Sequence, residues 1–296
     1  MRKSIVPVLV GLTVLIAGVF VASDRVSAIT GSQANVGNGK CWQNSAGKCY
    51  HWARTAPGLT LKVENDLTAA WTNLQADGKS YYTRSLADWS FTADPPATAT
   101  VDSVSLNMIP QNVYSSSPSC PGLSGIVRLC DRKYGFNGWL GLASIWIASD
   151  GEHITAGAVK LNNSYFSSAT YNTVAWRNLV SCQELAHTLG LGHEDENFNN
   201  ANLNSCMDYT SSPASNQFPS SDDKLTLANM YLAADASSTV SAASATSNGN
   251  GQELGNDDDA LPPGAGPKDG DVFVKHLSNG MTLVTHVFWV EKGNPR

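Results

Sequence analysis

Residues 183–193 read Gln-Glu-Leu-Ala-His-Thr-Leu-Gly-Leu-Gly-His, and this stretch decides how the chain is interpreted. On a helix with about 3.6 residues per turn, Gln183 and His187 lie one turn apart on the same face. Glu184 projects about 100° around the axis from Gln183, close to that face. A glycine three residues after His187 ends the helix and lets the chain turn, so that His193 comes back toward the same point. We expect these side chains to form an arc around a position that holds a metal ion.

The segment resembles the long zinc-binding signature of the metzincin metalloproteases, His-Glu-x-x-His-x-x-Gly-x-x-His, which is followed in that family by a methionine-containing turn. Residues 205–209, Ser-Cys-Met-Asp-Tyr, match that turn. The resemblance covers residues 55–232, but it is specific only over 183–209. The chain also resembles a group of secreted matrixin-like proteins that carry the same glutamine. The resemblance implies an α+β, zincin-type fold: a twisted mixed β-sheet, an active-site helix, the Met-turn and a small C-terminal subdomain.

The same resemblance implies a secreted zinc-dependent endopeptidase whose substrate is a protein or peptide. His187 and His193 would hold one catalytic Zn²⁺, which activates water and polarises the scissile carbonyl. Glu184 would be the general base and then the general acid. Tyr209 would bind the resting metal and then stabilise the oxyanion, and Met207 would pack beneath the metal.

Gln183 departs from the family pattern, because the first zinc-ligand histidine should stand at this position. A catalytic zinc normally has three protein ligands and an open position, and an amide oxygen is a weaker donor to zinc than imidazole. Three interpretations stay open. Gln183 ligates zinc with lowered affinity; or Tyr209, Asp195 or His153 takes its place; or the site is empty and the chain is an inactive binding or adhesion protein. A hydrolase of non-peptide bonds is a further alternative.

The ends of the chain predict export and several segments. A basic start, an apolar run and small residues at 26–28 are typical of a cleaved secretory signal, which predicts an extracellular protein. An uncleaved membrane anchor is the alternative, because the apolar run is nearly long enough to span a bilayer. A later Ser-, Ala-, Gly- and Asp-rich stretch is typical of a linker. The predicted organisation is a signal peptide (1–28), a disulfide-stapled lead-in (29–58), a metzincin-like catalytic domain (59–234), a low-complexity linker (235–270) and a C-terminal β-hairpin (271–296).

Six cysteines in an exported chain predict three disulfides. Although fifteen pairings exist for six cysteines, the local ones are the simplest: Cys41–Cys49, Cys120–Cys130 and Cys182–Cys206. A latency thiolate from Cys41 or Cys49 is an alternative, and the even count argues against it.

Composition excludes several classes of partner. Only 15% of the 296 residues are charged and the net charge is −6, so phosphate backbones of nucleic acids are poor partners. We expect no stable membrane association after signal cleavage, and a monomer. His276 and His286, in the terminal hairpin, are expected at the surface. Trp42, Tyr50 and Trp52 are expected to pack around the first disulfide, with sugar binding as the alternative, and the acidic run 257–259 is expected to be solvated.

Periodicity predicts the regular elements in outline. By resemblance, the strand at 140–147 is an edge strand that pairs with an extended substrate. Strands are predicted at 59–63, 101–109, 139–147 and 156–161, helices at 66–75, 172–189 and 221–234, and two strand-like runs within 272–289.

Overall fold

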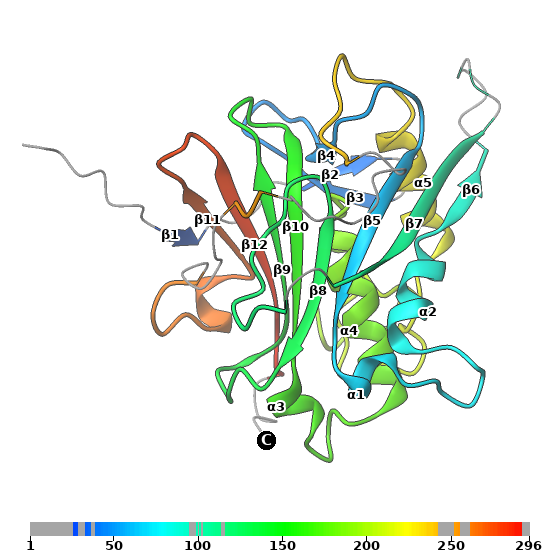
Figure 1. Cartoon of the computed structure of the whole chain (residues 1–296). Helices are drawn as coiled ribbons and strands as arrows, with labels where there is room; N and C mark the ends of the chain where they lie inside the picture. Colours follow the sequence, from blue (N-terminus) through cyan, green and yellow to red (C-terminus); the bar gives the residue numbers. More distant parts are fainter. Residues whose placement is uncertain are drawn as a thin grey trace, which may run out of the picture.

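The computed structural model describes residues 26–28, 33–36, 39–94, 99, 101, 103–113, 116–241, 252–254 and 261–291. These residues form an α+β fold in which one large mixed sheet has its main helices on one side (Figure 1). Nearly all of the predicted signal peptide and the whole acidic run 257–259 lie outside the described residues. No helix in the described part of the chain has the length and apolarity needed to cross a bilayer.

The elements have the following bounds. The strands are β1 Val26–Ala28, β2 Gln33–Val36, β3 Gly39–Trp42, β4 His51–Trp52, β5 Leu59–Asp66, β6 Phe91–Ala93, β7 Val104–Asn112, β8 Val127–Arg132, β9 Trp139–Ile147, β10 His153–Asn162, β11 Val272–His276 and β12 Thr282–Trp289. The helices are α1 Ala69–Thr72, α2 Tyr81–Asp88, α3 Asn163–Phe166, α4 Val174–His187, α5 Ser221–Met230 and the 3₁₀ turn η1 Pro267–Asp269.

The large sheet has the strand order β1-β11-β12-β9-β10-β8-β5-β7-β6, and β4 also pairs with β10. Strands β7, β5, β8 and β10 are mutually parallel, whereas β9 is antiparallel to β10 and β12 is antiparallel to β9. Strand β1 pairs with β11 at the outer edge, so cleavage after Ala28 would remove β1 and make β11 the edge strand.

The core lies on both faces of β9, whose nine residues are all buried. Helix α4 packs across β9, β10 and β12 on one face, and α2 packs against α4. On the other face, Trp146 joins the Cys120–Cys130 disulfide and Leu283 in a smaller apolar cluster. A strand that is buried on both faces needs apolar side chains on both faces, which explains why residues 139–147 are apolar at nearly every position.

The C-terminal hairpin is part of the large sheet. Strand β12 pairs with β9 in antiparallel register from Thr282 opposite Ile147 to Trp289 opposite Trp139. The prediction that 140–147 is an edge strand for substrate is therefore wrong, because β12 and β10 occupy its two sides. Local alternation could not reveal this pairing, which joins segments more than a hundred residues apart.

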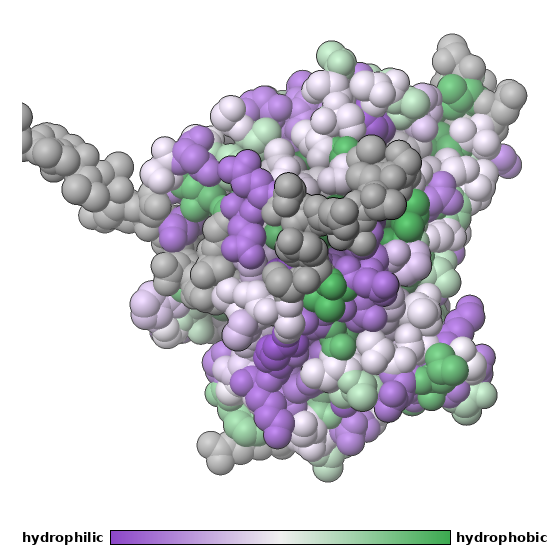
Figure 2. Space-filling view, in the orientation of Figure 1, coloured by the Kyte–Doolittle hydropathy of each residue, from purple (hydrophilic) through white to green (hydrophobic). Residues whose placement is uncertain are grey.

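Other elements agree with the sequence in part. The strand at 139–147 is present with the predicted bounds. The strand at 156–161 and the helices at 172–189 and 221–234 are present with at least one shifted end, and the helix at 66–75 shrinks to α1. Helix α2 and strand β8 were not predicted. The three disulfides join the expected pairs, so neither Cys41 nor Cys49 is a free thiol. On the face seen in Figure 2, hydrophobic residues form small separate patches among hydrophilic ones.

Candidate metal centre

Helix α4 and the turn after it bring the signature residues together. The Thr173 side chain accepts a hydrogen bond from the Trp176 backbone N–H and begins the helix, which ends at His187. Gly190 follows with φ of +96°, and a Cβ atom there would lie 2.0 Å from the Tyr50 carbonyl oxygen, so only glycine fits. The chain then returns, and the rings of His187 and His193 have centroids 4.6 Å apart.

Both histidines have one ring nitrogen held by an oxygen atom. His187 Nδ1 lies 2.8 Å from the Leu191 carbonyl oxygen, which can only accept, so Nδ1 carries the proton and Nε2 keeps its lone pair. His193 Nδ1 lies 3.3 Å from Glu196 Oε1 and 3.4 Å from Asp271 Oδ2. Metal-binding imidazoles typically have their second nitrogen fixed in this way.

The protonation state of His193 depends on the carboxylates of Asp271 and Glu196. Burial favours the neutral ring, but hydrogen bonds and charge from Asp271 and Glu196 prevail and raise the pKa of His193 to about 9. Burial likewise opposes ionisation of Asp271, but the hydrogen bond and charge of His193 prevail and lower the pKa of Asp271 to about 2. A bound cation would replace the proton on His193 and keep the same two acidic partners.

Glu184 is fully buried, and neither of its carboxylate oxygens has a hydrogen-bond partner. Burial raises the pKa of Glu184 well above its usual value, and the charge of His193 opposes this effect. Gly141 of β9 makes room for the side chain, since a Cβ atom there would lie 2.7 Å from Glu184 Oε1. A buried carboxyl group without partners is costly for a fold, so packing alone does not account for its place here.

Gln183 is tied to the Met-turn through its amide nitrogen. Its Nε2 donates to the Cys206 carbonyl oxygen at 2.7 Å, whereas the buried Oε1 has no hydrogen-bond partner. The Cys182–Cys206 disulfide links the same two segments. Met207, beside Cys206, is fully buried in the core. The free acceptor of Gln183 is therefore its side-chain oxygen, the atom that could ligate a cation.

Tyr209 lies against His193, with ring centroids 4.5 Å apart. Its hydroxyl donates to Asp271 Oδ2 at 2.9 Å, and burial together with the negative charge of Asp271 raises the pKa of Tyr209 well above its usual value. The hydroxyl therefore stays protonated near neutral pH and remains a hydrogen-bond donor.

The alternative ligands named from the sequence fall in different places. His153 lies with His51 and Asp235 in a separate cluster, so it is not a substitute for Gln183. The carboxylate of Asp195 accepts hydrogen bonds from the Asn197 backbone N–H and the Asn200 side chain. Of these three candidates, Tyr209 is the one with a described contact to a signature histidine.

His286 corrects a prediction, because it is fully buried and not at the surface. Its ring stacks on His187 at 4.5 Å between centroids with 17° between the planes, and also contacts Trp42 at 4.9 Å. Neither ring nitrogen has a hydrogen-bond partner, and burial, then the neighbouring His187, lowers the pKa of His286 well below its usual value. The other histidine of the hairpin, His276, is exposed, as predicted.

Two residues that the sequence did not place near the signature histidines, Trp42 and His286, pack over them. The Trp42 ring contacts His286 and also His193, where the ring centroids lie 5.8 Å apart. The lead-in therefore covers His187, His193 and His286 from one direction. His286 reaches His187 because β12 places this residue opposite Ala143 of β9. Only the sheet register connects position 286 with position 187, and no local motif carries that information.

The donor set fits a zinc ion. Imidazole nitrogens and amide or carboxylate oxygens are ordinary zinc ligands. Acceptors on Gln183, Glu184 and His286 are buried here without hydrogen-bond partners, and a cation would satisfy such lone pairs. The ring of His286 is almost parallel to the ring of His187 and lies over it. The two stacked rings therefore do not direct their nitrogen atoms at the same metal ion. The residues that would hold such an ion are therefore His187, His193 and Gln183.

An acidic cavity of about 530 Å³ adjoins this cluster at Tyr209 and Asp271. Its ten lining residues include three carboxylates, of Glu196, Asp271 and Glu291, and three aromatic rings, but no lysine or arginine. The lining is Glu196, Phe198, Asn199, Tyr209, Pro267, Gly270, Asp271, Trp289, Val290 and Glu291.

Comparisons of the chain with protein-family models, with curated proteins and with solved structures found no match. Functional conclusions about this chain therefore rest on its own residues.

Proposed function

We propose that the protein is a zinc-dependent endopeptidase that acts outside the cell. The observation that supports this proposal best is Glu184, a fully buried carboxyl group without hydrogen-bond partners, one turn from the ring of His187. A bound zinc ion would lower the pKa of a water molecule and polarise the scissile carbonyl. His187, His193 and the side-chain oxygen of Gln183 would hold the ion.

Glu184 performs the proton transfers in this proposal. In its ionised form it accepts a proton from the attacking water and then donates that proton to the leaving amine nitrogen. Burial raises its proton affinity, which makes it a stronger base than an exposed carboxylate. The Tyr209 hydroxyl breaks its hydrogen bond to Asp271 and then donates a hydrogen bond to the developing oxyanion. Trp42 and His286 limit the access of other water molecules.

The same geometry restricts how a substrate reaches the site. A peptide cannot add to β9 as a new strand, because β12 already pairs there. The acidic cavity beside Tyr209 and Asp271 is the alternative approach. Its carboxylates attract positive charge, and the rings of Phe198 and Trp289 offer faces for a cation. We therefore infer that the preferred substrates are peptides with a lysine or arginine next to the scissile bond.

The experiment is a cleavage assay of the zinc-loaded mature protein against a peptide library, with Glu184→Gln as the inactive variant. Glu253→Gln is the matched control, since Glu253 is an exposed carboxylate away from α4. We expect cleavage next to basic residues by the wild type and by the control, and its loss in Glu184→Gln. Cleavage that survives in Glu184→Gln contradicts the mechanism, and cleavage without preference for basic residues contradicts the substrate class.

A catalytically inactive binding protein is the second candidate. The observation that favours it is burial, because Gln183, Glu184, His187 and His193 are each at most 1% exposed. Zinc that binds with the affinity of a structural site, with no peptide cleaved from the library, would support this alternative.

A further inference from the structure

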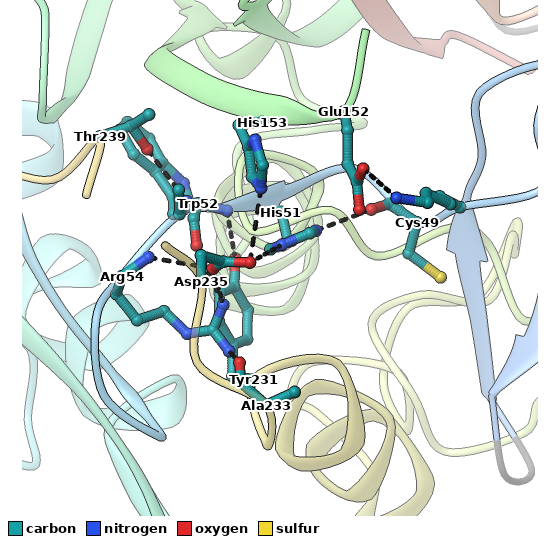
Figure 3. Close-up of polar contacts among 12 residues, drawn as sticks. Cys49, His51, Trp52, Arg54, Glu152, His153, Tyr231, Ala233, Asp235 and Thr239 are labelled. Atoms are coloured by element: carbon teal, nitrogen blue, oxygen red, sulfur yellow. Dashed lines mark hydrogen bonds and ion pairs between the residues drawn. The ribbon is translucent and has the colours of Figure 1, made fainter. Parts of the chain in front are cut away.

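His51, His153 and Asp235 form a second polar cluster, built from three elements that are not part of the α4 site (Figure 3). His51 is in β4 and His153 begins β10, and parallel pairing of these strands sets the two residues directly opposite each other. Asp235 follows α5 and reaches across to both rings. The cluster therefore joins the lead-in, the sheet and the segment after α5.

Two distances decide what this cluster is. His51 Nε2 lies 3.3 Å from Asp235 Oδ1, and His153 Nε2 lies 3.4 Å from the same oxygen. Charge-assisted N–H···O bonds are about 2.7–2.9 Å long, so both distances are long for ion pairs of this kind. Zinc–ligand bonds of about 2.0–2.2 Å in a tetrahedron place neighbouring ligand atoms about 3.3–3.6 Å apart. Both separations fall in the range expected for ligand atoms that share one cation, and the three ligand atoms all lie within 4.8 Å of one another.

Each candidate ligand is also oriented by a second partner. His51 Nδ1 lies 2.9 Å from the Cys49 carbonyl oxygen, so this nitrogen carries the proton and Nε2 faces Asp235. His153 Nδ1 lies 2.7 Å from Asp150 Oδ2, which leaves its buried Nε2 without a hydrogen-bond partner. Imidazoles that bind a metal through one nitrogen are commonly fixed through the other in this manner.

Arg54 fixes the carboxylate of Asp235 from the far side. Its guanidinium donates to Oδ2 at 2.7 Å and its backbone N–H donates to the same oxygen at 3.1 Å. Asp235 Oδ1 is thereby left to face the two histidines. The positive charge of Arg54 opposes a nearby cation, but its two hydrogen bonds keep Asp235 ionised and prevent it from turning away from His51 and His153.

We propose that His51 Nε2, His153 Nε2 and Asp235 Oδ1 bind a divalent transition-metal cation of the Zn²⁺ type, with water as a further ligand. Two imidazoles and a carboxylate suit zinc and do not suit calcium or magnesium, which take oxygen ligands. The cation would cross-link the lead-in to the segment after α5, so its role is structural. This site is independent of the proposed peptidase function, because it shares no residue with the α4 cluster.

The test is the number of zinc ions bound per full-length mature chain, measured by calorimetry and elemental analysis in the wild type, His153→Gln and Asp235→Asn. The exposed His276→Gln is the matched control. We expect His153→Gln and Asp235→Asn each to bind one zinc ion fewer than wild type, or to bind it at least 10-fold more weakly, while His276→Gln is unchanged. Equal zinc binding by all four proteins would overturn the proposal.

A second measurement needs no variant. Histidine acylation of the wild type, read by mass spectrometry, should slow at least several-fold at His51 and His153 when zinc is added, and stay unchanged at His276. Equal reaction with and without zinc at His51 and His153 overturns the proposal even if a variant does not fold. Failure of peptide cleavage would leave both of these results untouched, so this site and the proposed function are tested separately.

Discussion

Phe288→Ala tests whether the C-terminal strand belongs to the catalytic core. Phe288 is 1% exposed in β12, opposite Gly141 of β9. Its ring lies 5.5 Å from that of Tyr209 and 6.4 Å from that of Trp176, between centroids. The substitution therefore removes a fully buried ring from under a proposed catalytic residue.

Truncation of a buried phenylalanine to alanine costs about 3–5 kcal/mol, from lost transfer free energy and the remaining cavity. With a urea m-value of about 3 kcal/mol/M, the midpoint of unfolding should fall by about 1–1.7 M. Since Tyr209 loses one of its packing partners, we also expect lower peptidase activity in the folded variant.

The assay is urea denaturation at neutral pH without reductant, followed by fluorescence. Phe136→Ala is the matched control, because Phe136 is 57% exposed and should change the free energy of unfolding by less than about 1 kcal/mol. If Phe288→Ala were as stable as this control, the hairpin would be an appendage, and the reasoning that β12 closes the side of β9 would be refuted.

Three further variants test the zinc ligand, a disulfide and a buried carboxyl group. Gln183→His should tighten zinc binding at least 10-fold in a chelator competition assay, because imidazole is the better donor, and unchanged affinity would count against Gln183 as a ligand. Replacing both Cys182 and Cys206 by alanine opens a loop with a sequence separation of 24 and should cost about 3.5 kcal/mol in urea denaturation; a cost under about 1 kcal/mol would contradict this. Burial raises the pKa of Asp88 from 3.8 to about 6, so the folded protein favours the protonated carboxyl group. The stabilisation that this protonation gives is fully present below pH 3.8 and is lost as the pH rises through 6. Asp88→Asn should therefore be more stable than wild type at pH 7 by at most about 3 kcal/mol, less where solvent screens the charge, with no gain at pH 3.5, and a gain that is equal at both pH values would exclude this cause.

Much of the α4 site could be predicted because its information is local. Gln183, Glu184 and His187 are on one helix, so their spacing alone sets their relative directions, and Gly190 indicates the turn that returns His193. The disulfides are also between cysteines close in sequence. Strand β9 could be recognised because residues 139–147 are apolar at nearly every position, which is typical of a buried strand.

What the sequence did not reveal depends on contacts between distant segments. His286 and Trp42 reach the site through sheet pairing and chain return, and neither belongs to a motif. Asp235 meets His51 and His153 for the same reason. Helix α2 was missed because its tyrosine-rich sequence has strand propensity, and the Ser80 capping box together with packing against α4 overrides that preference.

The most direct test of the central claim is the zinc content and peptide-cleavage rate of Glu184→Gln compared with wild type under identical conditions. The variant should keep the zinc content of the wild type, and its kcat should fall by at least about 100-fold, the usual contribution of a general base. Cleavage by Glu184→Gln at the wild-type rate, or a wild type that binds no zinc through His187 and His193, would contradict that claim.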